Sequence, residues 1–212
     1  MSTATSEETE RGTQARIAEL AKDAFGQHAL TVMGPGRWKC RRPDSGTYGF
    51  YVFIGPGAVM VYGDIGEGIF RMSEPEDGVI PWLRGAVESP DYLLGKLRAA
   101  DVEDGKQKFY AGDALEWAHQ HYVDTVIAVD ENDPNAIARV GGDEAKRATE
   151  FFIDVKEADE YAELDRHRFL TMANDAGLDD MYGVAMGPSP SALWLVHALT
   201  AFVRLYDARA SQ

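Results

Sequence analysis

Short strand-like segments separated by glycine and proline turns fill residues 37–72, and this feature most constrains the fold. Residues 48–54 are rich in aromatic and β-branched side chains, and glycine-containing turns at 55–57 and 63–68 flank the next apolar segment. Segments of this length between such turns are typical of antiparallel strands. We therefore predict a β-meander of about four strands, at residues 37–42, 48–54, 58–62 and 69–72.

The segment at 48–54 carries apolar side chains on both of its faces. Successive side chains of a strand alternate between faces, so Phe50, Val52 and Ile54 share one face, and Tyr51 and Phe53 share the other. This pattern predicts a central strand with at least one face covered by helices. A bare outer face would form an apolar patch suited to a protein partner. We expect the aromatic residues to belong to the core instead.

Helices are predicted for most of the remaining chain. Apolar residues at helical spacing indicate a helix that ends near Gly26. Ser189 followed by Pro190 is a typical helix start, and this last helix should run to about residue 206 and be largely buried. The segment at 123–129 is rich in β-branched residues and stays open between strand and helix. Further helices are predicted at 79–87, from 90 to about 100, and at 114–122, 143–152 and 155–170.

These elements predict an α+β fold with a helical C-terminal half. Residues 1–12 are polar and are expected to be a flexible N-terminus. Residues 13–212 are predicted to form a single α+β domain, within which 13–105 and 106–212 can form separate lobes.

Charge is unevenly distributed along the chain, whose net charge is −14. Residues 1–99 hold 11 basic and 13 acidic side chains, whereas residues 100–212 hold 10 basic and 22 acidic ones. An acidic second half disfavours direct nucleic-acid binding, because it repels phosphates. It suits a basic partner, including a protein or ribonucleoprotein complex whose own groove is positive. The alternative is that the acidity serves solubility alone.

The predicted partner-binding residues are carboxylates of the acidic half. Some belong to the predicted helix at 155–170 and the residue before it, and the others to a polar loop at 130–135. They are Asp154, Glu157, Glu160 and Glu163, together with Asp130, Glu131 and Asp133.

The alternative to a partner-binding surface is a catalytic metal site. His119 and His121 would share one side of a strand, but on a helix this spacing sends them to nearly opposite sides. Glu116 and His119 resemble half of a di-iron motif whose second half the chain lacks. The glycines at 34–39 and 63–68 lack the spacing of phosphate or dinucleotide loops. We therefore predict no cofactor and keep a metal-dependent enzyme using His119, His121 and nearby carboxylates as an alternative.

The single cysteine, Cys40, excludes an intramolecular disulfide and fits a reducing compartment. Neighbouring cations such as Lys39 and Arg41 can lower a thiol pKa, but no histidine spacing supplies a base, so a structural cysteine is expected. The first residues lack the basic and apolar regions of a signal peptide, and no apolar run of about 18 residues occurs. We therefore expect a cytoplasmic protein without a membrane span.

Residues 37–98 carry a motif that resembles uncharacterised proteins of bacteriophages and prophages. The residues that carry it are Trp38, Cys40, Pro43, Ser45, Tyr48 and Phe50, then Gly63, Asp64, Ile65 and Gly66, then Trp82 and Gly85, and finally Asp91, Tyr92, Leu93 and Lys96. The resemblance brings no known active site. It implies a phage accessory protein, and small acidic proteins of this kind are often inhibitors of host defence, such as anti-CRISPR proteins.

The leading hypothesis is therefore a non-enzymatic protein-binding module, such as a phage-encoded inhibitor of a host defence or nucleic-acid-handling complex. It would act by occupying a basic surface with carboxylates. The alternatives are the metal-dependent enzyme and a structural phage subunit that forms stable homo-oligomers. The sequence leaves a homodimer open.

Overall fold

The computed structural model describes residues 9–73, 75–101, 107–127, 142–178, 181 and 184–211. The chain divides into two compact units. The sheet unit comprises residues 13–108 and 188–212, and the helical unit comprises residues 1–12 and 109–187. In chain order the helical unit is therefore inserted between the strands of the sheet unit and its last helix. This division differs from lobes at 13–105 and 106–212, because the C-terminal helix belongs with the sheet.

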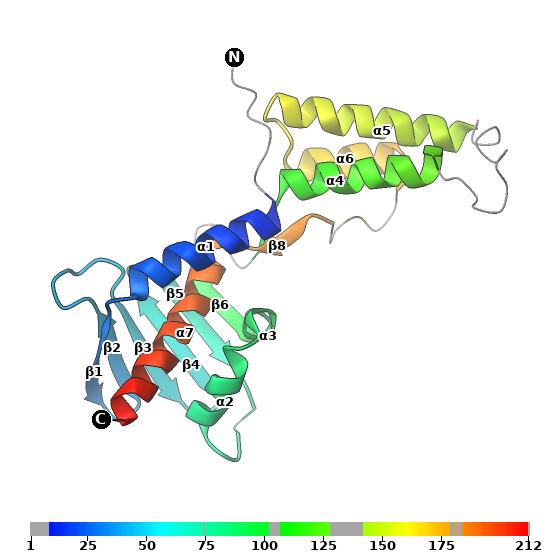
Figure 1. Cartoon of the computed structure of the whole chain (residues 1–212). Helices are drawn as coiled ribbons and strands as arrows, with labels where there is room; N and C mark the ends of the chain where they lie inside the picture. The colour runs from blue at the N-terminus through cyan, green and yellow to red at the C-terminus, as the bar shows by residue number, and fades with distance from the viewer. Residues whose placement is uncertain are drawn as a thin grey trace. The chain divides into compact units, whose positions relative to one another are not determined.

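Six antiparallel strands form the main sheet in sequence order (Figure 1). Each strand pairs with the next one along the chain, so the sheet is a meander and the α+β prediction is confirmed. The strands are β1 (Ala29–Gly34), β2 (Arg37–Arg41), β3 (Phe50–Gly55), β4 (Ala58–Gly63), β5 (Gly66–Arg71) and β6 (Leu97–Asp101).

The two edge strands, β1 and β6, are additions to the four strands expected from sequence. The prediction of helix from 90 to about 100 is wrong at its C-terminal end, because helix α3 (Pro90–Lys96) stops where β6 begins. Leu97 already has extended backbone angles and pairs with Phe70 of β5. Pairing with a neighbouring strand here overrides the local preference of the sequence for helix.

Helices pack against one face of this sheet. Helix α7 (Pro190–Ala210) contacts β1, β3, β4 and β5, as Figure 1 shows for the helix drawn in red. The Ser189 side chain accepts a hydrogen bond from the Ala192 backbone N–H at 3.2 Å, which confirms the predicted helix start. Helix α1 (Glu10–Phe25) begins before residue 13, inside the segment expected to be flexible. Helices α2 (Val79–Ala86) and α3 complete this layer.

The core of the sheet unit lies between this helical layer and the inner face of the sheet. Alternation along the strands places Phe50, Val52, Val59, Val61 and Phe70 on that face, and all five are fully buried. They belong to one cluster with Leu195, Leu199 and Phe202 of α7.

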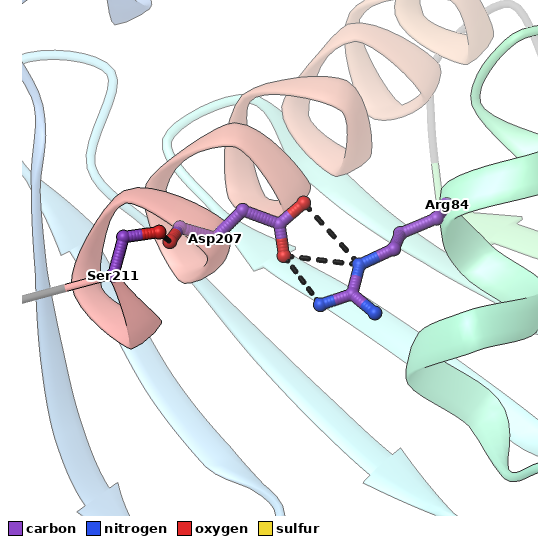
Figure 2. Close-up of polar contacts among 3 residues, drawn as sticks. All are labelled: Arg84, Asp207 and Ser211. Carbon is purple, nitrogen blue, oxygen red and sulfur yellow. Dashed lines mark hydrogen bonds and ion pairs between the residues drawn. The ribbon is translucent and has the colours of Figure 1, made fainter.

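An ion pair between Arg84 and Asp207 links α2 to α7 (Figure 2). The Arg84 Nη2 group donates to Asp207 Oδ1 at 2.6 Å, and Nε donates to the same oxygen at 3.0 Å. The Ser211 hydroxyl donates to the Asp207 backbone carbonyl at 2.9 Å. Both charged side chains are solvent-exposed, so this pair contributes little to stability.

The helical unit is built from α4 (Ala111–Tyr122), the π-helical segment η1 (Val123–Ile127), α5 (Asp143–Glu160) and α6 (Arg166–Asp175). The described part of the open segment at 123–129 is therefore helical. Two short strands, β7 (Gln107–Phe109) and β8 (Met186–Pro188), pair where the chain passes from one unit to the other. The core cluster of the helical unit includes Ala114, Ala118, Phe151, Val155, Phe169 and Ala173.

The predicted helix break at residues 153–154 is wrong. Helix α5 continues through it because Phe151, Val155 and Ala158 form an unbroken buried stripe. The chain turns after Tyr161 instead, where Ala162 takes a left-handed φ of 55°. Asp165 then caps α6 by accepting a hydrogen bond from the Arg168 backbone N–H at 2.8 Å.

Candidate protein-binding surface

The entire net charge of the chain resides in one unit. The helical unit holds 21 acidic and seven basic side chains, giving −14, whereas the sheet unit holds 14 of each and is neutral. A division into sequence halves understates this contrast, because residues 1–12, which carry three acidic side chains and one basic side chain, belong to the helical unit. The acidic surface therefore belongs to the helical unit alone.

Helix α5 presents the predicted partner-binding residues to solvent. Its buried stripe faces α4 and α6, so Asp154, Glu157 and Glu160 lie on the exposed side of the helix. Glu163 is also exposed and lies in the turn between α5 and α6. Asp130, Glu131 and Asp133 fall outside the described residues.

Some of these carboxylates are interleaved with cations. Asp154 and Glu157 make no ion pair with any residue that the structure describes. Other carboxylates of this surface form exposed ion pairs within the unit, and such pairs contribute little to stability, so a cation of a partner can replace the lysine or arginine in them. The pairs are Glu150 with Lys146 at 3.7 Å, Glu160 with Lys156 at 3.9 Å, and Glu163 with Arg168.

Asp154 also lines a groove of about 160 Å³ between α5 and α6. Phe151 and Met172 supply apolar surface in the groove, and Glu150, Asp154 and Asp175 supply carboxylates. Lysine and arginine side chains combine an apolar stem with a charged head, which is the chemistry this groove matches. Arg147 also lines the groove, which leaves the carboxylates in excess.

The two histidines of the metal alternative lie on α4 and contact different rings. A spacing of two residues on a helix separates side chains by about 200° around the axis. The His119 ring lies 5.3 Å from the ring of Phe152, and the His121 ring stacks on Trp117 at 5.2 Å. Across the described part of the chain, no group of three histidine, cysteine or acidic side chains is arranged to hold a metal ion.

Cys40 is fully buried in β2, on the inner face of the sheet. Burial raises the pKa of its thiol to about 12, so the neighbouring cations do not activate it. The expectation of a structural cysteine agrees with this geometry.

The outer face of the sheet forms a second surface, which is the alternative that the sequence analysis weighed and did not prefer. Tyr51, Phe53, Met60, Tyr62 and Ile69 are partly exposed and lie outside the core cluster of the sheet unit. The apolar alternation of residues 50–54 signalled that both faces of β3 are apolar. It carried no information about which face the helices cover, so the assignment of Tyr51 and Phe53 to the core is wrong.

Comparisons with protein-family models, with curated proteins and with solved structures find no match to this chain. None of the helices within the described ranges has the length and apolar character needed to cross a membrane.

Proposed function

We propose that the protein is a non-enzymatic binding module whose helical unit docks on a basic surface of another protein. The concentration of the whole net charge of −14 in this unit carries the proposal. Solubility alone does not require this concentration, because acidic residues serve solubility wherever they lie on the surface. Their segregation instead favours an electrostatically guided contact.

Two exposed apolar side chains on the acidic surface support a specific interface. Ile153 is 47% exposed and Tyr161 is 74% exposed, and both are close in sequence to Asp154 and Glu157. In protein interfaces, charges around the contact speed association, while a few apolar and aromatic side chains supply most of the affinity. Carboxylates would guide the approach of a basic partner, and Tyr161 and Ile153 would pack against it.

The resemblance of residues 37–98 to phage and prophage proteins extends the proposal to a class of partner. A phage-encoded inhibitor would occupy the positive groove of a host defence or nucleic-acid-handling complex and exclude its natural polyanion. Competition between this protein and nucleic acid for the same partner is the expected signature.

The test is capture of bacterial host proteins on the immobilised protein, compared between two variants of equal net charge. The first variant neutralises the four described carboxylates of the predicted site, with the substitutions Asp154→Asn, Glu157→Gln, Glu160→Gln and Glu163→Gln. The matched control neutralises four exposed carboxylates of the sheet unit as Asp44→Asn, Glu76→Gln, Asp77→Asn and Glu88→Gln.

We expect the first variant to bind basic proteins about tenfold more weakly or worse, and the control to bind as the natural chain does. Binding should also weaken as salt rises from about 0.05 M to about 0.5 M, since salt screens exposed charges. Equal losses in both variants would mean that net charge, not the helical unit, governs capture. Absence of any basic protein at low salt would overturn the proposal.

A further inference from the structure

The outer face of the six-stranded sheet carries two rows of side chains, set by the pairing register. One row contains Lys39 of β2, Tyr51 of β3, Tyr62 of β4 and Glu67 of β5, in that order across the strands. The second row contains Arg37, Phe53, Met60 and Ile69. The centre of this face is therefore aromatic and apolar, and its β2 side is cationic.

No helix of the sheet unit, within the described residues, packs on this face. The helices meet the sheet through the inner-face side chains, which are fully buried, whereas the outer-face apolar residues are partly exposed. An antiparallel sheet with one face in water normally alternates apolar and polar side chains. An outer face with Tyr51, Phe53, Met60 and Ile69 at its centre departs from that rule and marks an interaction surface.

The cations of β2 lie over the rings of β3. The Arg37 guanidinium lies 4.6 Å from the centre of the Phe53 ring, and the Lys39 ammonium lies 5.4 Å from the centre of the Tyr51 ring. Neither cation forms an ion pair with a carboxylate among the described residues, although the chain has 35 acidic side chains. These two positive charges are thus free to meet carboxylates from outside the unit.

The geometry of the rings favours a protein over a nucleic acid as the occupant. Tyr51 and Tyr62 stack on each other with their centres 4.9 Å apart and their planes inclined by 10°. Lys39 and Tyr62 flank Tyr51 on opposite sides in the register, so both faces of this ring are in use. Nucleic-acid bases need a free ring face for stacking. An acidic protein surface needs only the cations and the apolar centre.

The chain itself contains a surface with the complementary chemistry. The exposed side of α5 combines Asp154 and Glu157, which make no ion pair with described residues, with the exposed Ile153. Carboxylates on α5 can pair with Arg37 and Lys39, and Ile153 can pack on the apolar centre of the sheet face. We propose that the outer sheet face of one copy binds α5 of a second copy, in a head-to-tail contact.

This inference rests on the proposed function in one respect, since it uses the same acidic surface and takes the sheet face of a second copy as one basic partner. The contact joins two different surfaces, so each chain offers one of each and assembly can continue beyond a dimer. Self-association would then compete with binding of a foreign basic protein.

The test is sedimentation velocity of the full chain over a range of concentrations and salt. We expect self-association at about 0.05 M salt and its loss at about 0.5 M salt, because screening weakens the ion pairs. A sheet variant, Arg37→Glu with Lys39→Glu, and a helix variant, Asp154→Lys with Glu157→Lys, should each associate about tenfold more weakly or worse. The control for the sheet variant, Arg16→Glu with Lys22→Glu, changes the same charge on exposed residues of α1 and should associate normally.

Mixing the sheet variant with the helix variant decides the geometry. The first retains an intact α5 and the second retains an intact sheet face, and their reversed charges also complement each other, so the mixture should associate although neither variant does so alone. A mixture that stays monomeric while the natural chain associates would overturn the head-to-tail contact, as would a natural chain that is monomeric at low salt. The sheet variant keeps its acidic surface and should still capture basic host proteins, which separates a failure of this inference from a failure of the proposed function.

Discussion

The two units of this protein divide stability and charge between them. The sheet unit is neutral and buries large side chains such as Phe50, Phe70 and Phe202 against a continuous inner sheet face. The helical unit carries the net charge of −14, and alanines make up much of its core. Repulsion among like charges disfavours a compact state, while buried apolar area favours it. From this comparison we expect the sheet unit to be the more stable of the two, and the helical unit to be destabilised by the charge of its surface.

The largest expected effect comes from removing one buried ring in the sheet unit. Phe202→Ala removes a fully buried side chain that packs against Trp38, with ring centres 5.3 Å apart. We expect it to lower the free energy of unfolding of the sheet unit by about 3–5 kcal/mol. Urea unfolding followed by tryptophan fluorescence measures this loss, since Trp38, Trp82 and Trp194 belong to the sheet unit.

The matched change in the helical unit is Phe169→Ala. Phe169 is 1% exposed and lies 6.3 Å from the ring of Trp117, the single tryptophan of that unit. In a variant that retains Trp117 as its only tryptophan, fluorescence reports the urea unfolding of the helical unit. We expect Phe169→Ala to lower the midpoint of this transition and to leave the unfolding transition of the sheet unit unchanged. If both substitutions move one shared transition equally, the two units do not hold separate stabilities.

The next effect concerns how closely α7 packs on the sheet. A Cβ atom added at Gly68 would lie 2.7 Å from Leu195 Cδ1 and 3.1 Å from Leu97 Cδ1, so these side chains must shift. We expect Gly68→Ala to destabilise the sheet unit by about 1–3 kcal/mol, as overpacked cores do. Gly55→Ala is the control, because nothing lies within 4 Å of the added atom there. A neutral Gly68→Ala in the same urea titration would mean that the core is looser than the contact distances indicate.

The sequence was sufficient to predict the centre of the sheet and the last helix. Alternating apolar residues and glycine turns define β3 and β4 locally, and Ser189 with Pro190 defines the start of α7 locally. Strand β6 could not be predicted in this way, since its residues become extended only by pairing with β5. The end of α5 was missed for a related reason, because neither glycine nor proline marks the turn at residues 161–165.

The candidate surface was predicted in composition but not in arrangement. The exposure of Asp154, Glu157 and Glu160 follows from helical periodicity. The full segregation of charge by unit depends on residues 1–12 belonging to the helical unit, for which the sequence holds no local signal. The bare outer face follows likewise from where the helices pack.

The smallest expected effect is a pH dependence of the sheet unit, which contains one buried histidine, His28, and one half-buried histidine, His197. Burial lowers the pKa of His28, and the cations Arg42 and Arg204 add to this effect against an opposing hydrogen bond to the Tyr48 carbonyl. Burial also lowers the pKa of His197. The unfolded chain binds protons at these sites near the ordinary value of 6.5, whereas the folded unit binds them only at lower pH. Stability is therefore retained above about pH 6.5 and falls as the pH drops toward the folded-state pKa values.

The double variant His28→Gln with His197→Gln tests whether this loss belongs to the sheet unit. Glutamine keeps a hydrogen-bond donor at position 28 but does not titrate, so the unfolding midpoint of the sheet unit should vary less between about pH 7.5 and about pH 5.5 than in the natural chain. The transition reported by Trp117 should respond to pH as it does without the substitutions. An unchanged slope in the sheet unit would show that other groups take up its protons.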